Sequence, residues 1–248
     1  MAENIELSMT IILLNAAQHV EKVFDDFVAE MKKSGIKNFE IIPVINGCTD
    51  NTIEKVNEMK KKYKQYKIIP IIRDNIWYGA GMMAGLNKSK GRLVGYLWGN
   101  NKVPMENVSL IYKKIIKENL DLGKTKRTAR QYSFSRRMQS LLFNKFFMIL
   151  MFGRITSDFN GCPKIMKRTA FEKMKLHCFD SFFDAEIMVK AKLLKLKIGE
   201  VPTVYRMQVE GQKIKSFVKP TMLFEFLKNI FKLKFALTFR TDPFYKKD

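Results

Sequence analysis

Polar residues follow the predicted strands of this chain at the points where a bound ligand would meet them. The apolar segment 39–46 (FEIIPVIN) is followed by the turn Gly47-Cys48-Thr49-Asp50. Ligands of parallel sheets bind at the carboxyl ends of the strands, so Asp50 is a candidate binding residue. Asp50 also stands just before a helix predicted over 52–66, where an aspartate commonly caps the first turn. The sequence leaves both interpretations open.

A glycine-rich segment follows the third predicted strand. Gly79, Gly81 and Gly85 resemble the glycines of a dinucleotide-binding turn, but their spacing and their position after the third strand do not fit that motif. A turn that leads into a helix over 81–88 is the interpretation we favour.

A basic segment, residues 124–137 (KTKRTARQYSFSRR), is the strongest candidate for binding an anion, and its polar composition predicts a mobile stretch. Arginine binds phosphate through two parallel hydrogen bonds. The segment contains Arg127, Arg130, Arg136 and Arg137. A solvated run of charge is the alternative. Further along, the acidic residues Asp184 and Glu186 are interpreted either as site residues or as ion-pair partners of nearby lysines.

The charge of the whole chain limits its partners. The sequence holds 45 Lys and Arg against 24 Asp and Glu, a formal net charge of +21, which attracts polyanions. Nucleic acid is disfavoured, because the aromatic residues near the basic runs belong to apolar faces and are not spaced for base stacking. Three scattered cysteines and two histidines predict neither a disulfide framework nor a histidine zinc site, and they favour a reducing compartment.

Predicted strands and helices alternate through the first half of the chain. Apolar runs typical of buried strands cover residues 8–15, 39–46, 67–73 and 93–98, and helical periodicity covers residues 20–34, 52–66 and 81–88. This alternation is typical of a parallel sheet with helices on both faces. We therefore expect an α/β fold with a Rossmann-like, mostly parallel sheet.

The second half is organised differently. Residues 138–152 are apolar on nearly every side, and later segments predict a strand at 164–166, a helix at 184–197 and a strand at 199–205. No stretch reaches the ~18 apolar residues that a membrane-spanning helix needs.

The C-terminal tail predicts an amphipathic helix from Pro220. Its polar stripe holds Glu225, Lys228, Asn229 and Lys232, and its apolar face holds Leu223, Phe226, Leu227, Ile230 and Phe231. Lys234 falls on the apolar face. We expect one domain over residues 1–215 and a basic tail, residues 216–248, that lies on an anionic membrane surface.

Several short segments occur in an order that resembles one family. They are 39–52 (FEIIPVINGCTDNT), 75–81 (NIWYGAG) with Gly85, 91–97 (GRLVGYL), 158–164 (DFNGCPK), 183–186 (FDAE) and 200–202 (EVP). Over roughly residues 8–215 the chain is similar to glycosyltransferase family 2, in its polyprenyl-phosphate (dolichyl-phosphate) sugar synthase branch. The resemblance implies a GT-A fold and the inverting transfer of a sugar from a nucleotide sugar to a polyprenyl phosphate, at the cytoplasmic face of a membrane.

The resemblance also implies roles for individual residues. It places the acceptor phosphate on Arg127, Arg136 and Ser140. It places the nucleotide sugar on residues that end or follow the predicted strands, which are Asn15, Asn46, Asp50, Gly79 and Asn100. It makes Asp158 and Asp184 candidate catalytic residues that orient sugar hydroxyls or the reacting centre.

The chain departs from the family pattern where the family binds a metal ion. The family's Asp-x-Asp is here Trp98-Gly99-Asn100, which leaves Asn100 as the one candidate ligand for Mg or Mn. We expect Lys102, assisted by Arg73 or Arg206, to supply positive charge beside the leaving diphosphate as a third candidate catalytic residue. The alternative is a catalytically silent relative that binds lipid phosphate or a partner enzyme. A homo-oligomer or a partner membrane protein also stays open.

Overall fold

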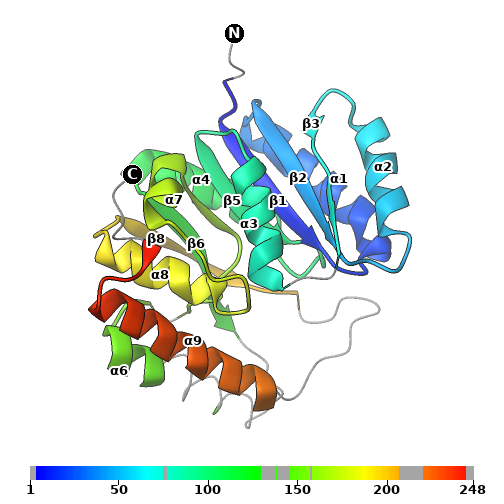
Figure 1. The fold of residues 1–248 in the computed structure, drawn as a ribbon. Helices are drawn as coiled ribbons and strands as arrows, with labels where there is room; N and C mark the ends of the chain where they lie inside the picture. The colour runs from blue at the N-terminus through cyan, green and yellow to red at the C-terminus, as the bar shows by residue number, and fades with distance from the viewer. Residues whose placement is uncertain are drawn as a thin grey trace.

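The computed structural model describes residues 4–74, 77–129, 138, 146–156, 158–206 and 220–243. Within this part of the chain, one sheet has the strand order β3-β2-β1-β5-β7-β6-β8, and β4 also pairs with β2 (Figure 1). The strands are β1 (Leu7–Leu13), β2 (Phe39–Asn46), β3 (Lys67–Ile68), β4 (Ile71–Arg73), β5 (Leu93–Trp98), β6 (Leu122–Ala129), β7 (Lys164–Lys167) and β8 (Ile198–Val204). Only β7 runs antiparallel to its described neighbours, β5 and β6, so the expected mostly parallel sheet is confirmed.

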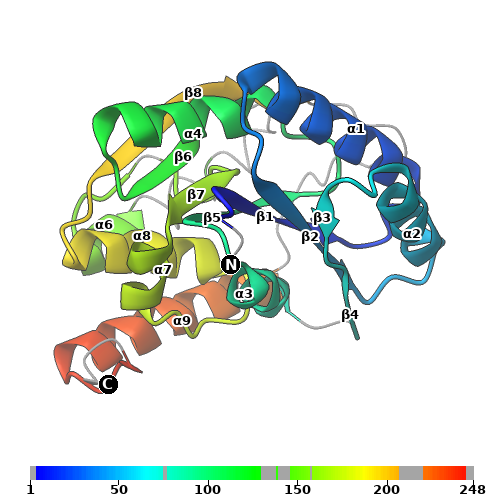
Figure 2. The same ribbon diagram turned by 90° about the horizontal axis from the view of Figure 1, so that it is seen from above.

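Helices cover both faces of the sheet. They are α1 (Ala17–Ser34), α2 (Thr52–Lys62), α3 (Tyr78–Lys88), α4 (Glu106–Glu118), α6 (Met148–Phe152), α7 (Arg168–Met174), α8 (Phe183–Leu193) and α9 (Pro220–Thr238). Figure 2 shows α1 and α4 on one face, and α3, α8 and α9 on the other. This layered α/β arrangement matches the expected fold class.

The centre of the sheet is apolar on both of its faces. Every residue of β2 is buried, and in β1 only Ile12 is partly exposed. A strand without a solvent face has no polar alternation, so both strands are apolar runs that the sequence predicts well. Helix α1 ends at Gly35, which adopts the left-handed φ of 74° that glycine accepts without strain.

The glycine-rich segment lies inside α3 rather than in a turn before it. The helix begins at Tyr78, three residues earlier than expected. A Cβ on Gly85 would lie 2.2 Å from Thr10 Cγ2, and a Cβ on Gly81 would lie 2.8 Å from Ile12 Cδ1. These glycines therefore let α3 approach β1 closely.

The prediction of a mobile stretch over residues 124–137 is wrong for its first part. Residues 122–129 form strand β6, which pairs with β7 on one side and with β8 on the other. The strand sequence LGKTKRTA has no apolar alternation, so periodicity could not identify it. Tertiary pairing of the strand's backbone outweighs this local pattern.

Helix α9 packs against the domain as part of its core. Ile230, Leu233 and Leu237 are buried, and Phe226 contacts Phe182 with ring centroids 5.1 Å apart. Beyond the helix, the buried Asp242 lies 2.9 Å from Lys190 of α8 and fixes the end of the segment. No described helix has the length and apolarity that crossing a bilayer requires.

The apolar face expected for the tail is divided between two surfaces. Phe226 and Ile230 face the core, whereas Phe231 is 53% exposed. Lys234 does not end the helix; it is exposed, and its ammonium lies 6.0 Å from the ring centroid of Phe152.

Candidate functional site

The parallel strands β1, β2, β5 and β6 end at one edge of the sheet, and the loops that follow them bring most of the predicted residues together (Figure 1). Asn15 follows β1, Asn46 ends β2, Lys102 follows β5, and Arg127 lies near the end of β6. This carboxyl edge is the candidate active site.

Asn15 and Asp50 organise the loops after β1 and β2. Asn15 has a φ of 45°, and its side-chain oxygen accepts a hydrogen bond of 2.8 Å from the backbone N–H of Thr49. The Asp50 carboxylate accepts backbone hydrogen bonds from Ala17 (3.0 Å) and Thr52 (3.2 Å), the first residues of α1 and α2. Asp50 therefore performs the capping role that the sequence left open.

The titration of Asp50 reflects this capping role. Burial raises the pKa of the Asp50 carboxyl, but hydrogen bonds from Thr52 and Ala17 outweigh burial and lower the pKa below its ordinary value. An ionised carboxylate is therefore fixed at the junction of the two helix N-termini, where it also favours both helix dipoles.

Asn46 and Gly79 are both packed against neighbouring segments of the chain, Asn46 against α3 and Gly79 against residues 178–180. Asn46 is buried beneath α3, and a Cβ on Gly81 would lie 3.4 Å from its side-chain oxygen. Gly79 faces the backbone of residues 178–180, and a Cβ there would lie 2.7 Å from the carbonyl oxygen of Cys178. Gly79 therefore allows α3 to pack closely against residues 178–180. These surroundings do not support the predicted contact between Gly79 and a nucleotide sugar.

The loop after β5 carries Lys102 and is hydrogen-bonded to Arg206, which follows β8. The Asn100 side-chain oxygen accepts a hydrogen bond of 3.3 Å from the backbone N–H of Lys102. Arg206 donates its backbone N–H to the carbonyl oxygen of Lys102 at 2.9 Å, and its guanidinium donates to Asn101. The Arg206 guanidinium also lies 3.5 Å from Asp26 of α1. Two cationic residues are therefore tied to this loop.

Asp184 is the centre of a buried polar network. Its carboxylate accepts hydrogen bonds from the hydroxyls of Tyr96 (2.6 Å) and Tyr78 (3.1 Å), and it forms an ion pair with Lys164. The indole N–H of Trp98 donates to the Tyr78 hydroxyl at 3.0 Å. Burial and the Asp184 charge raise the pKa of both tyrosines well above the ordinary value, so both remain hydrogen-bond donors. Asp184 is therefore connected to the carboxyl edge through the hydroxyl of Tyr78. Its ion pair with Lys164 agrees with the interpretation of Asp184 as a partner of a nearby lysine.

A second ion pair joins Asp158 to Arg127. The buried Asp158 carboxylate accepts hydrogen bonds of 2.9 Å from both the backbone N–H and the Nε of Arg127. The guanidinium carbon of Arg127 lies 5.6 Å from the ring centroid of Tyr205, which in turn contacts Trp98 edge-on. Asp158 therefore orients Arg127, and Arg127 keeps a defined position at the edge. The other residues expected to bind the acceptor, Arg136 and Ser140, lie outside the described residues.

Periodicity missed two buried lysines that support this edge. Lys124 and Lys164 face each other in the register of β6 and β7, and both are fully buried. Lys124 lies 3.0 Å from Glu200, its neighbour on β8. Burial and the nearby Lys164 charge lower the pKa of Lys124 to about 8. The sequence held a signal only for Lys164, which begins the strand predicted over 164–166; for Lys124 it held none, because β6 was not predicted.

Unfolding experiments can detect this shifted lysine. Between pH 8 and the ordinary pKa of 10.5, the unfolded chain holds a proton that folded Lys124 has released. Stability therefore rises with pH in this window, by up to about 1.4 kcal/mol per pH unit. We expect the difference in unfolding free energy between wild type and Lys124→Met to shift in favour of wild type from pH 8 to 10. Lys126→Met, on the same strand but exposed, is the control, and a pH-independent difference for Lys124→Met would contradict the shift.

The residues after β5 do not fit a divalent cation. Mg and Mn prefer several oxygen ligands, usually carboxylates. At this place the structure offers the Trp98 indole and the Asn100 amide, and the amide oxygen already accepts a hydrogen bond from Lys102. Arg206 adds a further positive charge beside the loop. We therefore derive no catalytic step through a metal ion here.

Within the part of the chain that the structure describes, one further group of side chains has the spacing of metal ligands. His177, Glu186 and Asp242 place ligand atoms within 4.8 Å of one another. The Lys190 ammonium lies among them, 2.9 Å from each carboxylate and 3.2 Å from His177 Nδ1. A buried ammonium already neutralises this cluster, which therefore functions as an ion-pair network that fixes α8 to the end of α9.

Comparison with known proteins identifies the family of this chain. The chain belongs to glycosyl transferase family 2, whose model matches residues 8–175. It is 25% identical over 206 residues to an undecaprenyl-phosphate 4-deoxy-4-formamido-L-arabinose transferase of Edwardsiella ictaluri, covering 83% of this chain and 62% of the relative. It is 24% identical over 235 residues to the dolichyl-phosphate beta-glucosyltransferase of Saccharomyces cerevisiae, covering 86% of this chain and 70% of the relative.

A solved structure supports the fold. A mannosyltransferase from Pyrobaculum calidifontis, in complex with GDP-Man and Mn2+, superposes with a TM-score of 0.59 at 14% identity, covering 82% of this chain and 56% of that one. The chain therefore has the GT-A type of fold. The manganese ion belongs to that protein.

Proposed function

We propose that this protein is an inverting glycosyltransferase that moves a sugar from a nucleotide sugar to a polyprenyl phosphate at a membrane surface. The observation that carries the proposal is the carboxyl edge, where Asp158 orients Arg127 and where Arg206 is hydrogen-bonded to the loop that carries Lys102. Family membership and the two lipid-phosphate relatives support the same reaction.

The proposed reaction needs charge and position more than proton transfer. A phosphate oxygen of the acceptor attacks the anomeric carbon, the bond from that carbon to the nucleoside diphosphate breaks, and the diphosphate leaves with the electron pair. The acceptor phosphate is anionic at neutral pH, so no strong base is required. Positioning and preorganised charge then supply the acceleration.

In this reaction the acceptor phosphate and the nucleotide sugar bind to different residues of the carboxyl edge. Arg127, with Arg136 and Ser140, binds the acceptor phosphate. Lys102 and Arg206 neutralise the diphosphate, and Asp184 positions Tyr78 and Trp98 beside the reacting sugar through their hydrogen bonds. Asp158 acts by holding the Arg127 guanidinium in one orientation.

Exposed apolar side chains of α6 and α9 support association with a membrane. Helices α6 and α9 lie side by side (Figure 1). Exposed apolar residues of the two helices, together with Phe146 just before α6, are named here the aromatic ridge: Phe146, Ile149, Leu150, Phe224, Phe231 and Phe235. Lysines of α9 flank the ridge, and each adds about 1 kcal/mol near an anionic surface. We propose that the ridge enters the interface of an anionic bilayer, on the cytoplasmic side, as a peripheral contact.

A triple substitution tests this contact. Because Ile230 and Leu233 are buried, removing all of α9 would disturb the core, so side chains of the ridge are the better target. Phe224→Ser, Phe231→Ser and Phe235→Ser together are expected to release the protein from anionic vesicles in a sedimentation assay. The matched control is Leu110→Ser with Ile116→Ser, two exposed apolar residues of α4, which should leave binding unchanged. Equal binding by the ridge variant would contradict the proposal.

A catalytically silent relative that binds lipid phosphate is the second candidate. The neutral residues of the Trp98-Gly99-Asn100 segment favour it. A panel of nucleotide sugars separates the two: an enzyme is stabilised against thermal unfolding by its donor and transfers the sugar, whereas a silent relative is stabilised by the lipid phosphate alone.

A further inference from the structure

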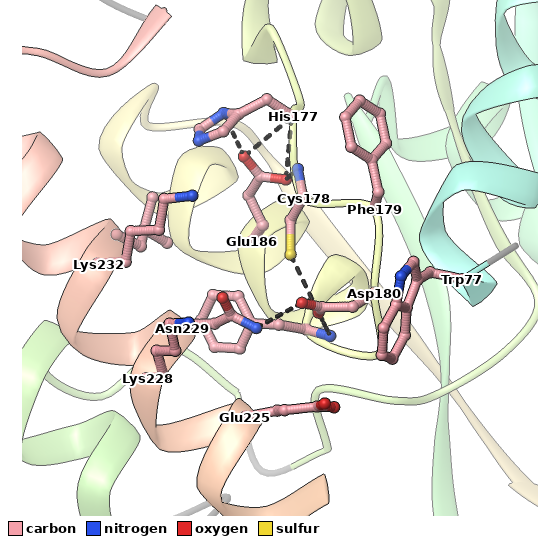
Figure 3. Close-up of a pocket in the computed structure, with 12 residues that line it drawn as sticks. Trp77, His177, Cys178, Phe179, Asp180, Glu186, Glu225, Lys228, Asn229 and Lys232 are labelled. Atoms are coloured by element: carbon pink, nitrogen blue, oxygen red, sulfur yellow. Dashed lines mark hydrogen bonds and ion pairs between the residues drawn. The ribbon is translucent and has the colours of Figure 1, made fainter.

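A pocket of about 410 Å³ lies between Trp77, the segment before α8, and α9 (Figure 3). None of the residues to which we assign substrate binding or catalysis lines it. Its size is that of a small-molecule site. Because the proposed transfer does not use this pocket, its role is a separate question.

The floor of the pocket is held in place by hydrogen bonds. The Asp180 carboxylate accepts a hydrogen bond of 2.7 Å from the backbone N–H of Phe182 and another from the side-chain amide of Asn229 on α9. On the α3 side, the backbone N–H of Ala80 donates to the carbonyl oxygen of Phe179 at 2.8 Å. The close approach of Gly79 to this segment permits that contact. The pocket is therefore formed by fixed elements from three parts of the chain.

Two lysines give one wall of the pocket a positive charge. Lys228 and Lys232 are four residues apart on α9, so they lie on the same side of the helix. Figure 3 shows both on the pocket wall opposite Trp77. Among the described residues neither takes part in an ion pair, and Glu225 lines the same wall farther toward the start of the helix. An anion between the two ammonium groups would gain charge-assisted hydrogen bonds from both.

Aromatic rings form the other wall. Trp77 is 59% exposed and Phe179 is 53% exposed, and both line the pocket. Ligand sites commonly combine such apolar faces with a few placed polar groups. The Asp180 and Glu225 carboxylates and the Asn229 amide can bond hydroxyl groups beside the rings.

We propose that this pocket binds a sugar phosphate, with the phosphate between Lys228 and Lys232 and the sugar ring against Trp77. The chemistry fits either a free hexose phosphate or the headgroup of a phosphate-linked glycolipid. A glycolipid headgroup in a bilayer can reach the pocket, because α9 lines the pocket and also carries the aromatic ridge proposed to enter the membrane.

Tryptophan fluorescence provides a direct test. The chain holds two tryptophans, so Trp98→Phe leaves Trp77 as the sole indole reporter. Titration with glucose 1-phosphate should change its fluorescence saturably, and calorimetry on the unsubstituted chain should give the same affinity. Inorganic phosphate, which cannot stack on the ring, should bind more weakly. No saturable signal by either method at millimolar ligand would overturn the proposal.

Lysine variants locate the phosphate and distinguish its source. Lys228→Ala or Lys232→Ala should each weaken glucose 1-phosphate binding about tenfold, the loss of one charge-assisted hydrogen bond. Lys234→Ala removes the same charge from another side of α9 and should leave the affinity unchanged. The source is assigned with phosphatidylcholine vesicles that carry a glucosyl-phosphoryl lipid. Lysine-dependent binding to these vesicles that is tighter than binding of free glucose 1-phosphate would assign the lipid headgroup. Equal affinities would assign the free sugar phosphate. Equal weakening by Lys234→Ala would overturn the proposal. These titrations contain no nucleotide sugar, so they stand or fall separately from the transferase reaction.

Discussion

Replacement of Asp184 by alanine is expected to lower the free energy of unfolding by about 3–5 kcal/mol. The substitution would leave the ammonium of fully buried Lys164 without its carboxylate, and the hydroxyls of Tyr96 and Tyr78 without their acceptor. An uncompensated buried charge costs far more than the cavity left by a small side chain. Chemical denaturation of the variant and of wild type measures the effect.

Two comparisons make this prediction specific. Asp121→Ala removes a partly exposed ion pair with Lys167 and a hydrogen bond from the backbone N–H of Lys197, and it should cost about 1–2 kcal/mol. The double variant Asp184→Leu with Lys164→Met removes both charges and should recover much of the lost stability. An Asp184→Ala protein as stable as the Asp121→Ala protein would show that the buried pair is not formed.

Replacement of Lys102 by alanine is expected to lower kcat/KM for sugar transfer by about 100-fold, while a metal chelator leaves most of the activity of wild type. The proposed reason is that fixed cations at the loop after β5, Lys102 and Arg206, stabilise the leaving diphosphate. Loss of one preorganised electrostatic contact typically costs about 2.7–4 kcal/mol in the transition state. Steady-state kinetics with and without chelator measure both effects.

The control for Lys102 is a lysine of α4. Lys113→Ala removes one positive charge from that helix, away from the edge, and should leave kcat/KM unchanged. Arg206→Ala should act in the same direction as Lys102→Ala. Strict dependence on manganese, with Lys102→Ala fully active, would contradict a role for fixed charge.

The parts of the fold that follow apolar periodicity were predictable. Strands β1 and β2 are apolar because both of their faces are buried, and α1 ends at Ser34, the end predicted for the helix over 20–34. Strand β6 was not predictable, since its stability comes from pairing with β7 and β8, which lie far away in sequence. The segment 67–73 is divided into β3 and β4 around Pro70, and this break interrupts the single strand expected there.

The location of the predicted site residues at the sheet edge followed from the sequence better than their contacts with one another did. The resemblance to the family predicted Asp158, Asp184 and Arg127 as site residues, and all three lie at or beneath the carboxyl edge, while their roles stay predictions. Their mutual contacts could not be predicted, because the Arg127 pair spans 31 residues and the contact from Tyr78 to Asp184 spans 106. Only tertiary structure brings such groups together.

The most direct test of the proposed reaction is transfer of labelled sugar into lipid. The protein is incubated with a panel of labelled nucleotide sugars and a short polyprenyl phosphate, and the organic phase is counted. The proposal predicts label in the organic phase for at least one donor, and none when the corresponding polyprenol without phosphate replaces the acceptor. A folded protein that binds the polyprenyl phosphate but transfers no sugar from any donor would contradict the proposal and establish the silent relative instead.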